Sequence, residues 1–272
     1  MWAYGFVHEE SMRCYQRAVE LDPECVTAHW GIAYAVGPNY NVAWDAFTDQ
    51  ELAEVGATAH GAVQRALAAS HGNAVERELA QALAARFPSA EMTDDLQARS
   101  IAYADVMAGV HHRHPRDLDV AALCADALMN VTPWQLWDRW TGEPADGSRV
   151  LEARRVLENA LALPGGAEHA GVVHLYIHLM EMSQEPETAL PVADRLRTLV
   201  PDAAHLVHMP THLDVLCGDY RRAVDWNRRA ALADTKYVQH AGSLNFAALY
   251  RAHNLHFLAY GAMFLGRAGD AL

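Results

Sequence analysis

The spacing of the apolar residues limits the fold of this chain more than any other feature. Apolar side chains recur every three or four positions in the segments 10–21, 74–87, 96–110 and 150–163. This period places them on one face of an α-helix. Turn-forming pairs such as Asp22-Pro23 and Pro164-Gly165 separate the segments. No segment alternates in the manner of a half-buried strand, so we predict an all-α protein of roughly a dozen helices.

Three segments share one pattern of small, aromatic and basic residues, and they span positions 8–23, 186–202 and 218–234. Ala189 and Ala223 lie 34 residues apart, as do Pro201 and Thr235. The pattern and the 34-residue period resemble those of the tetratricopeptide repeat family. That resemblance implies an α-solenoid, a right-handed superhelix of tetratricopeptide-like helical pairs with a concave groove.

The resemblance covers the two ends of the chain better than its middle. We predict a single repeat domain over residues 1–272, with recognisable repeats in 1–41 and 148–272 and degenerate helical pairs in 42–147. Repeat arrays usually close with polar capping helices, and neither end of this sequence shows one. A partner that covers the ends, or a longer protein, is therefore expected.

Histidine is the most unusual residue in the composition. The chain has 16 histidines in 272 residues, and nine of them fall between His169 and His256. In the tetratricopeptide family the second, fifth and ninth residues of each first helix face the groove. First helices beginning at Ala170, Ala204 and Ala252 would place histidine at seven of these nine positions. The nine are Gly171, His174, His178, His205, His208, His212, His253, His256 and Tyr260.

Three interpretations of the seven histidines compete: ordinary surface or core histidines, a groove that captures an anion or a peptide, and a metal site. We favour the metal site, because residues four apart on a helix share one face and packed helices lie only about 8–10 Å apart. Neutral imidazole is also a common metal ligand. Tetratricopeptide grooves that bind peptide carboxylates tend to use Lys, Arg and Asn, and the only lysine here is Lys236.

The ligand type narrows the choice of metal. A site rich in histidine and free of thiolate suits copper first, then iron or zinc. Seven histidines exceed the four ligands of a structural zinc site, which suggests a dinuclear centre or supporting roles for some of them. Calcium and magnesium are disfavoured because they prefer oxygen ligands.

Three further residues are candidates for proton transfer. Glu181 follows His174 and His178 on the same helical face, Asp126 lies on the preceding candidate helix, and Tyr260 occupies a groove position. A carboxylate behind an imidazole also fixes its tautomer. Pro210, between His208 and His212, is expected to kink its helix. The segment 235–251 departs from the repeat length, and we expect it to form either a lid over the groove or a surface loop without a role in the site.

Composition excludes several classes of function. A formal net charge of −13 disfavours nucleic-acid binding. The sequence has no apolar stretch long enough for a membrane span and no signal-peptide pattern at its start, which favours the cytoplasm.

The four cysteines form no C-x-x-C pair and are expected to be buried. Trp134, Trp137 and Trp140 are spaced as one face of a core helix.

The first hypothesis is therefore a metalloenzyme, a copper- or iron-dependent oxidoreductase that acts on a small molecule. The second is a non-catalytic scaffold whose groove binds a peptide partner or a structural metal. A zinc-dependent hydrolase is a weaker third hypothesis. The sequence contains no phosphate-binding glycine loop, no G-x-S-x-G elbow and no H-E-x-x-H motif that would indicate another enzyme class.

Overall fold

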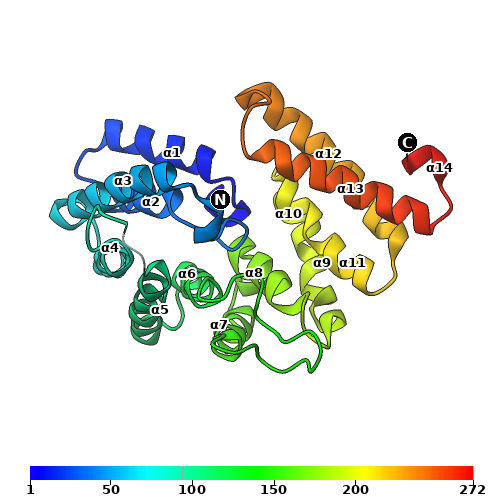
Figure 1. The fold of residues 1–272 in the computed structure, drawn as a ribbon, viewed down its shortest axis with the longest axis horizontal. Coiled ribbons are helices and arrows are strands. Elements are labelled where there is room, and N and C mark those ends of the chain that lie inside the picture. Colours follow the sequence, from blue (N-terminus) through cyan, green and yellow to red (C-terminus); the bar gives the residue numbers. More distant parts are fainter. Residues whose placement is uncertain (93–94, 272) are drawn as a thin grey trace. The chain divides into compact units, whose positions relative to one another are not determined.

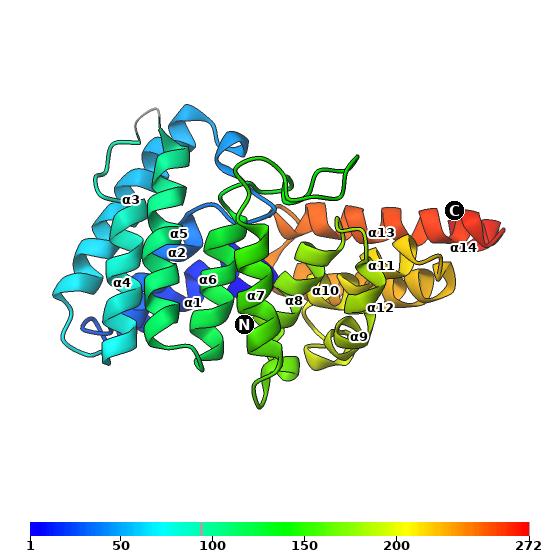
Figure 2. The ribbon, with the colours of Figure 1, turned by 90° about the horizontal axis from the view of Figure 1, so that it is seen from below.

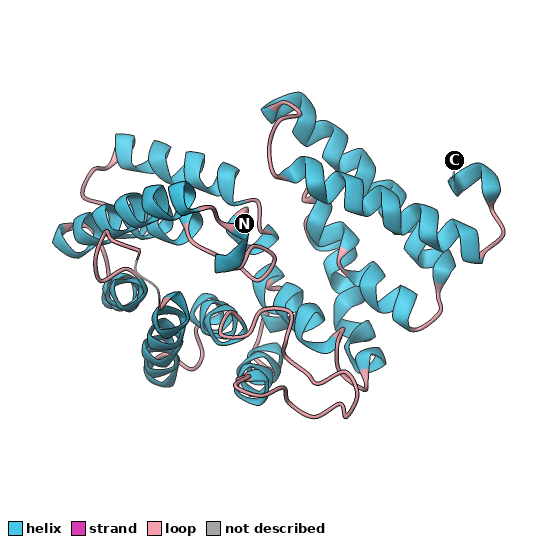
Figure 3. Ribbon diagram, in the orientation of Figure 1, coloured by secondary structure: helices cyan, strands magenta, loops and turns pink. Residues whose placement is uncertain are grey.

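The computed structural model describes residues 1–92 and 95–271, and its regular secondary structure is helical (Figure 3). No β-strand occurs in these residues, which contain only isolated bridges such as that between Cys25 and His71. The prediction of an all-α fold is therefore confirmed. No helix in the same part of the chain is both long enough and apolar enough to cross a lipid bilayer.

The chain divides into two compact units, which are described one at a time. The N-terminal unit comprises residues 8–138 and 143–156. The C-terminal unit comprises residues 1–7, residues 139–142 and the chain from Leu157 onward. The expectation of one repeat domain over residues 1–272 stays a prediction.

In the N-terminal unit, consecutive helices pack against each other, and Figure 2 shows α4, α5 and α6 side by side. Helix α7 (Val150–Leu161) begins in this unit and ends in the other. The remaining elements are α1 (His8–Leu21), α2 (Val26–Val36), the 3-10 turn η2 (Trp44–Ala46), α3 (Asp49–Ala68), α4 (Ala74–Arg86), α5 (Leu96–Arg113) and α6 (Leu118–Met129).

Local sequence signals explain where these helices begin. Thr48 and Asn73 each form a capping box with the glutamate three residues later, so two free backbone N–H groups are satisfied at the start of α3 and of α4. Asp95 and Asp117 cap α5 and α6 in the same way through one side-chain oxygen. The predicted helices 74–87 and 96–110 agree with α4 and α5 at their starts and nearly agree at their ends.

The core of the N-terminal unit includes polar groups. Helix α6 is buried from Val120 to Met129, and that buried stretch includes Asp126. The carboxylate of Asp126 accepts hydrogen bonds from the Tyr34 hydroxyl at 3.0 Å and from the Asn130 amide at 2.9 Å. Burial raises the pKa of Asp126 to about 6, although the nearby Arg86 guanidinium and these hydrogen bonds oppose the rise.

In the C-terminal unit, α12 and α13 run antiparallel as a long pair (Figure 1). Gly261 lets them approach closely, because an added Cβ would lie 3.1 Å from Val224 and 3.2 Å from the Tyr220 carbonyl. The elements of this unit are η1 (Ala3–Gly5), η3 (Gly166–Glu168), α8 (Ala170–Met180), η4 (Pro186–Ala189), α9 (Leu190–Leu199), α10 (Ala204–His208), α11 (Pro210–Leu216), α12 (Tyr220–Ala241), α13 (Ala247–Phe264) and α14 (Ala268–Ala271).

Two departures from the repeat pattern lie in the helices of the C-terminal unit. Pro210 divides one predicted helix into α10 and α11, since proline lacks the N–H that would continue the helix. The segment 235–251 is not a loop: it lengthens α12 to Ala241 and starts α13 at Ala247, with only a short turn between them. The predicted start at Ala252 is therefore five residues late.

Two other expectations were wrong. Trp134, Trp137 and Trp140 do not form a helical face, because residues 130–149 contain no helix. Prolines and positive-φ glycines interrupt that segment, and Trp140 is 94% exposed. Of the four cysteines only Cys124 is buried, whereas Cys14 and Cys217 are exposed.

Candidate metal centre

Three histidines of the C-terminal unit converge in a buried group that we call the first triad: His174, His178 and His205. Their side chains offer nitrogen atoms that all lie within 4.8 Å of one another. His174 and His178 are one turn apart on α8, and His205 lies on α10. None of the three residues is more than 4% exposed. Polar rings buried this deeply require partners or a bound ligand.

Tyr4, near the start of the chain, fixes the orientation of His174 in the first triad. The Nδ1–H group of His174 donates to the backbone carbonyl of Tyr4 at 2.6 Å, so the lone pair of His174 is on Nε2. This Nε2 atom lies 3.1 Å from Nε2 of His205. Nδ1 of His205 is buried without a hydrogen-bond partner. The first triad therefore contains a ring nitrogen whose bonding capacity the protein does not use.

A second triad follows on the next helices and consists of His208, His212 and His253. His208 ends α10, His212 lies on α11 beyond Pro210, and His253 lies on α13. Nε2 of His212 is 2.8 Å from Nε2 of His208 and 3.5 Å from Nε2 of His253. Each of the three residues offers a ring nitrogen, and these nitrogens all lie within 4.8 Å of one another.

Asn227 orients His208 from behind. The Nδ1–H group of His208 donates to the Asn227 side-chain oxygen at 2.6 Å. The Asn227 amide nitrogen donates in turn to the Thr211 hydroxyl and to the Ala223 carbonyl, which fixes the direction of the amide. Both Asn227 and Thr211 are fully buried. The tautomer of His208 is therefore set by a rigid group on α12.

Glu181 joins the two triads. It accepts from Nδ1 of His178 at 2.7 Å through one carboxylate oxygen and from Nδ1 of His212 at 2.5 Å through the other. Its side chain is 7% exposed. Burial opposes the ionised carboxylate, but His212 and the two hydrogen bonds hold the pKa of Glu181 well below its usual range. One carboxylate therefore fixes an imidazole in each triad.

These contacts leave the metal-binding lone pairs on Nε2. Four of the six imidazoles donate Nδ1–H to a backbone carbonyl, an amide oxygen or a carboxylate, as metal-ligating histidines usually do. Metal–nitrogen bonds of about 2.0–2.1 Å place two coordinated nitrogens roughly 3 Å apart. The separations of 2.8, 3.1 and 3.5 Å between ring nitrogens in the two triads fit that requirement.

Burial favours the neutral form of five of the six imidazoles, which is the form that binds metals. Burial lowers the pKa of His174, His205 and His208 well below the usual value, and neighbouring histidines lower it further. Burial and His212 lower the pKa of His253 to about 4. Burial lowers the pKa of His178 as well, although Glu181 opposes this.

Aromatic rings surround both triads. The Phe6 ring lies 4.6 Å from His174 and stacks on His178, and the Tyr250 ring stacks on His205 at 4.4 Å. Phe257 stacks on His212 at 4.8 Å. Such an apolar shell limits the access of water and lowers the local dielectric.

The structure brings together six of the seven predicted histidines and Glu181. His256 and Tyr260 lie on the exposed side of α13, outside both triads. Because α13 starts earlier than expected, His253 and Phe257 are the residues of this helix that contact His208 and His212. Asp126 belongs to the N-terminal unit, where Tyr34 and Asn130 are its partners.

Sequence reasoning missed the supporting residues Tyr4, Phe6, Asn227, Tyr250 and Phe257. Tyr4 acts through a backbone carbonyl, which carries no sequence signal. Asn227 lies on a second helix, whose side chains the groove rule does not consider. Tyr250 lies in the segment expected to be a lid or a surface loop.

A cavity of about 270 Å³ adjoins the first triad and is lined by His205. Trp2, Tyr237 and Tyr250 contribute aromatic walls, and Asp234 is a carboxylate among them. The segment 235–251 thus forms part of a cavity wall, because it supplies Tyr237, Ala247 and Tyr250. A small, mostly apolar molecule fits a cavity of this size and lining.

Comparison with known proteins does not identify the chain: no family model matches it, and no curated protein matches it. The chemistry of the site therefore has to be argued from its own residues.

Proposed function

We propose that this protein binds two transition-metal ions, one in each histidine triad, with Glu181 as the carboxylate that orients both. The contact between His208 and His212 carries this proposal. Both residues donate their Nδ1–H groups to other acceptors, so in their neutral forms the two rings direct lone pairs at each other across 2.8 Å. This arrangement is repulsive unless a cation lies between or beside the nitrogens.

A proton is the alternative cation, and it would make His212 an imidazolium paired with Glu181. A proton at that position does not account for the first triad, where Nε2 of His174 and Nε2 of His205 face each other at 3.1 Å. A metal ion in each triad accounts for the facing Nε2 atoms in both triads. It also explains why four Nδ1 atoms are each held by a separate acceptor.

The ligand chemistry supports copper first, then iron or zinc, because the ligands are neutral nitrogens without thiolate. Three protein ligands for each metal leave a coordination position for water or substrate, as in catalytic sites. The adjoining cavity of about 270 Å³ has room for a small molecule beside His205. We therefore propose a copper- or iron-dependent oxidoreductase, in which the metal supplies redox or Lewis-acid chemistry when bound.

The roles proposed for the acidic residues follow from their contacts. Both carboxylate oxygens of Glu181 accept hydrogen bonds from imidazoles, which makes it a positioning residue rather than a proton carrier. Tyr260 is 40% exposed, and Asp126 is hydrogen-bonded within the N-terminal unit. Neither Tyr260 nor Asp126 is part of the proposed centre.

The repeat family also remains a proposal. Helices α8 and α10 begin at Ala170 and Ala204, which are 34 residues apart, and each precedes a helix that packs against it. This periodic pairing supports tetratricopeptide-like repeats that form a superhelix.

The cysteines form no disulfide among the described residues, which supports a cytoplasmic location for the protein.

Metal content provides the test. The full chain is loaded separately with copper(II) and zinc(II), desalted, and analysed for metal by mass spectrometry and for absorption in the visible range. We expect two equivalents in the wild type and a loss of about one equivalent in His178→Ala and in His208→Ala. His256→Ala is the matched control, because this exposed histidine lies on α13 outside both triads.

The outcomes separate the alternatives. A wild type that retains no metal, or triad variants that load as fully as the wild type, would contradict the metal centre. Retention of copper with a visible band supports the oxidoreductase and justifies measurement of oxygen uptake with candidate substrates. Retention of zinc alone would indicate a structural site or a zinc-dependent hydrolase instead.

A further inference from the structure

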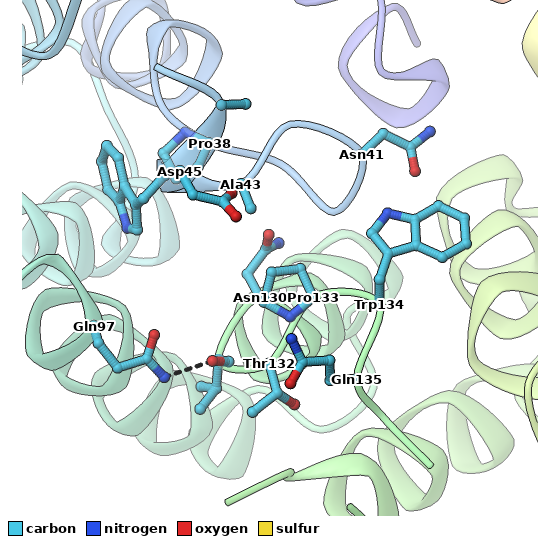
Figure 4. Close-up of a pocket in the computed structure, with 13 residues that line it drawn as sticks. Pro38, Asn41, Ala43, Asp45, Gln97, Asn130, Thr132, Pro133, Trp134 and Gln135 are labelled. Atoms are coloured by element: carbon cyan, nitrogen blue, oxygen red, sulfur yellow. Dashed lines mark hydrogen bonds between the residues drawn. The ribbon is translucent and has the colours of Figure 1, made fainter. Parts of the chain in front are cut away.

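The N-terminal unit contains a cavity of about 530 Å³ that is lined only by residues of this unit (Figure 4). Its walls come from the loop after α2, the start of α5 and the loop after α6. Small-molecule sites usually measure about 300–1,000 Å³, so the cavity is large enough for one. None of its residues takes part in the proposed metal centre.

Two side-chain amides in the cavity wall are turned in a fixed direction. The Gln97 amide nitrogen donates to the Val131 carbonyl at 2.6 Å, which is the dashed line in Figure 4. The Asn130 amide nitrogen donates to the backbone carbonyl and to the carboxylate of Asp126, at 2.8 and 2.9 Å. Because both nitrogens are held by protein oxygens, Gln97 and Asn130 keep their own amide oxygens as acceptors for a ligand.

A buried network holds the second of these amides. Asp126 is 2% exposed and accepts from the Tyr34 hydroxyl as well as from Asn130. Buried networks whose members are satisfied are rigid. The acceptor oxygen of Asn130 is therefore preorganised. The buried carboxylate of Asp126 serves to hold the Asn130 amide in this orientation.

Trp134 lines the cavity from a strained turn. The Gln135 N–H donates to the Thr132 carbonyl at 3.0 Å, which closes a turn with Pro133 in its second position. Trp134 occupies the third position with φ of 60°, a left-handed conformation that glycine or asparagine normally adopts there. Bulky residues are held in such conformations mainly at functional sites. The Trp134 side chain packs beside Tyr40 and is nevertheless 43% exposed.

The charge of the lining excludes several ligands. Asp45 is the only ionisable residue among the described residues that line the cavity, and no Lys, Arg or His is present. Phosphates and carboxylates would have no cation to pair with. The fixed acceptors require a ligand with several O–H or N–H donors, and the exposed indole ring requires an apolar face on the same ligand.

We infer that this cavity binds a neutral carbohydrate. Sugar hydroxyls donate to the oxygens of Gln97, Asn130 and Asp45, while the C–H face of the sugar ring packs on the Trp134 indole. The amide of Gln135, also in the lining, is available as a donor to the same hydroxyls. This binding site is independent of the metal centre and goes beyond the proposed function.

The test uses the full chain and a panel of neutral sugars that contains glucose, galactose, mannose, maltose and cellobiose. Binding is measured by saturation-transfer NMR and by titration calorimetry, with putrescine as a charged amine probe. We expect at least one sugar to bind saturably. Trp134→Gly should weaken it by at least about tenfold, which corresponds to about 1.4 kcal/mol, and Gln97→Leu should weaken it as well. Trp140→Ala is the matched control, since this tryptophan is 94% exposed and does not line the cavity.

Trp134→Gly is a suitable variant because glycine accepts the left-handed conformation, so circular dichroism should show an intact fold. The inference is overturned if no sugar of the panel binds at millimolar concentration, or if putrescine binds in preference to all of them. It is also overturned if a folded Trp134→Gly variant binds as the wild type does, or if Trp140→Ala loses binding.

Discussion

Replacement of Glu181 by glutamine probes the centre most sharply, because the change keeps the shape of the side chain and alters one atom of its hydrogen-bonding end. In the native protein both carboxylate oxygens accept from imidazole Nδ1–H groups, one from His178 and one from His212. A glutamine amide has only one oxygen, and its NH2 group is a donor. In Glu181→Gln one of the two imidazoles therefore meets a donor where it needs an acceptor.

The consequence for metal binding follows from the tautomers. The imidazole that faces the NH2 group must move its proton from Nδ1 to Nε2, and Nε2 is the atom that faces the other ligands. Loss of such a supporting partner typically weakens metal affinity about 10–100-fold, or roughly 1.4–2.7 kcal/mol. We expect this loss in one triad, with a smaller change in the other.

The assay is a competition titration with zinc(II) and a chromophoric chelator, fitted to two sites. Glu187→Gln is the matched control, because Glu187 is an exposed neighbour on η4 and contacts neither triad. Wild-type affinity at both sites in Glu181→Gln, within about twofold, would refute the reasoning that this carboxylate sets the tautomers.

Three further predictions concern other parts of the structure. Gly171→Val should weaken metal binding at the first triad but not at the second. An added Cβ would lie 2.6 Å from the Tyr4 ring and would displace the Tyr4 carbonyl that holds His174. First-triad affinity equal to that of the wild type in the competition titration would contradict this. Zinc(II) should raise the melting temperature of the wild type by several degrees and leave that of His208→Ala less affected, as scanning calorimetry can show. The pKa of Asp126 is about 6 in the folded protein, above its unfolded value of 3.8, so the folded state binds the proton more tightly and stability falls as pH rises from about 4 to 6. Asp126→Asn should remove that part of the pH dependence, on the order of 3 kcal/mol, in urea unfolding curves; an unchanged slope would show that Asp126 does not titrate in this range.

The helices were largely predictable from the sequence, because their signals are local. The starts of α4, α5, α8 and α10 coincide with predicted starts, and at the first two an asparagine and an aspartate cap the helix. The end of α12 was not predictable from the repeat pattern, since residues 235–241 continue the helix to Ala241 although Thr235, Tyr237, Val238 and His240 have only moderate helix propensity. Because the groove rule counts positions from the start of a helix, the late predicted start of α13 made it select the exposed His256 and Tyr260 and miss Phe257.

The candidate site was predictable where the helical period alone decides it. His174, His178 and Glu181 share a face because of their spacing on α8 and its C-terminal turn. The contributions of Tyr4, Asn227 and Tyr250 depend on packing between segments distant in sequence, which a pattern of three or four cannot encode. Asp126 illustrates the same limit, because its helical position said nothing about which buried partners it would find.

Two tryptophans show why spacing alone misleads in the segment 130–149. Trp134 and Trp137 are three residues apart, yet Pro133 and a positive φ at Trp134 prevent a helix. The aromatic face that the sequence suggested is replaced by one buried ring and one exposed ring beside a cavity.

Anomalous X-ray scattering tests the central claim most directly. Crystals of the copper-loaded protein, measured on both sides of the copper absorption edge, should show two anomalous peaks in each chain. We expect one peak within about 2.0–2.2 Å of the Nε2 atoms of His208 and His212, and the other at the same distance from Nε2 of His174. Glu181 should remain hydrogen-bonded to Nδ1 of His178 and His212. An absence of peaks at both triads in loaded crystals, or peaks only at exposed histidines such as His256, would contradict the account.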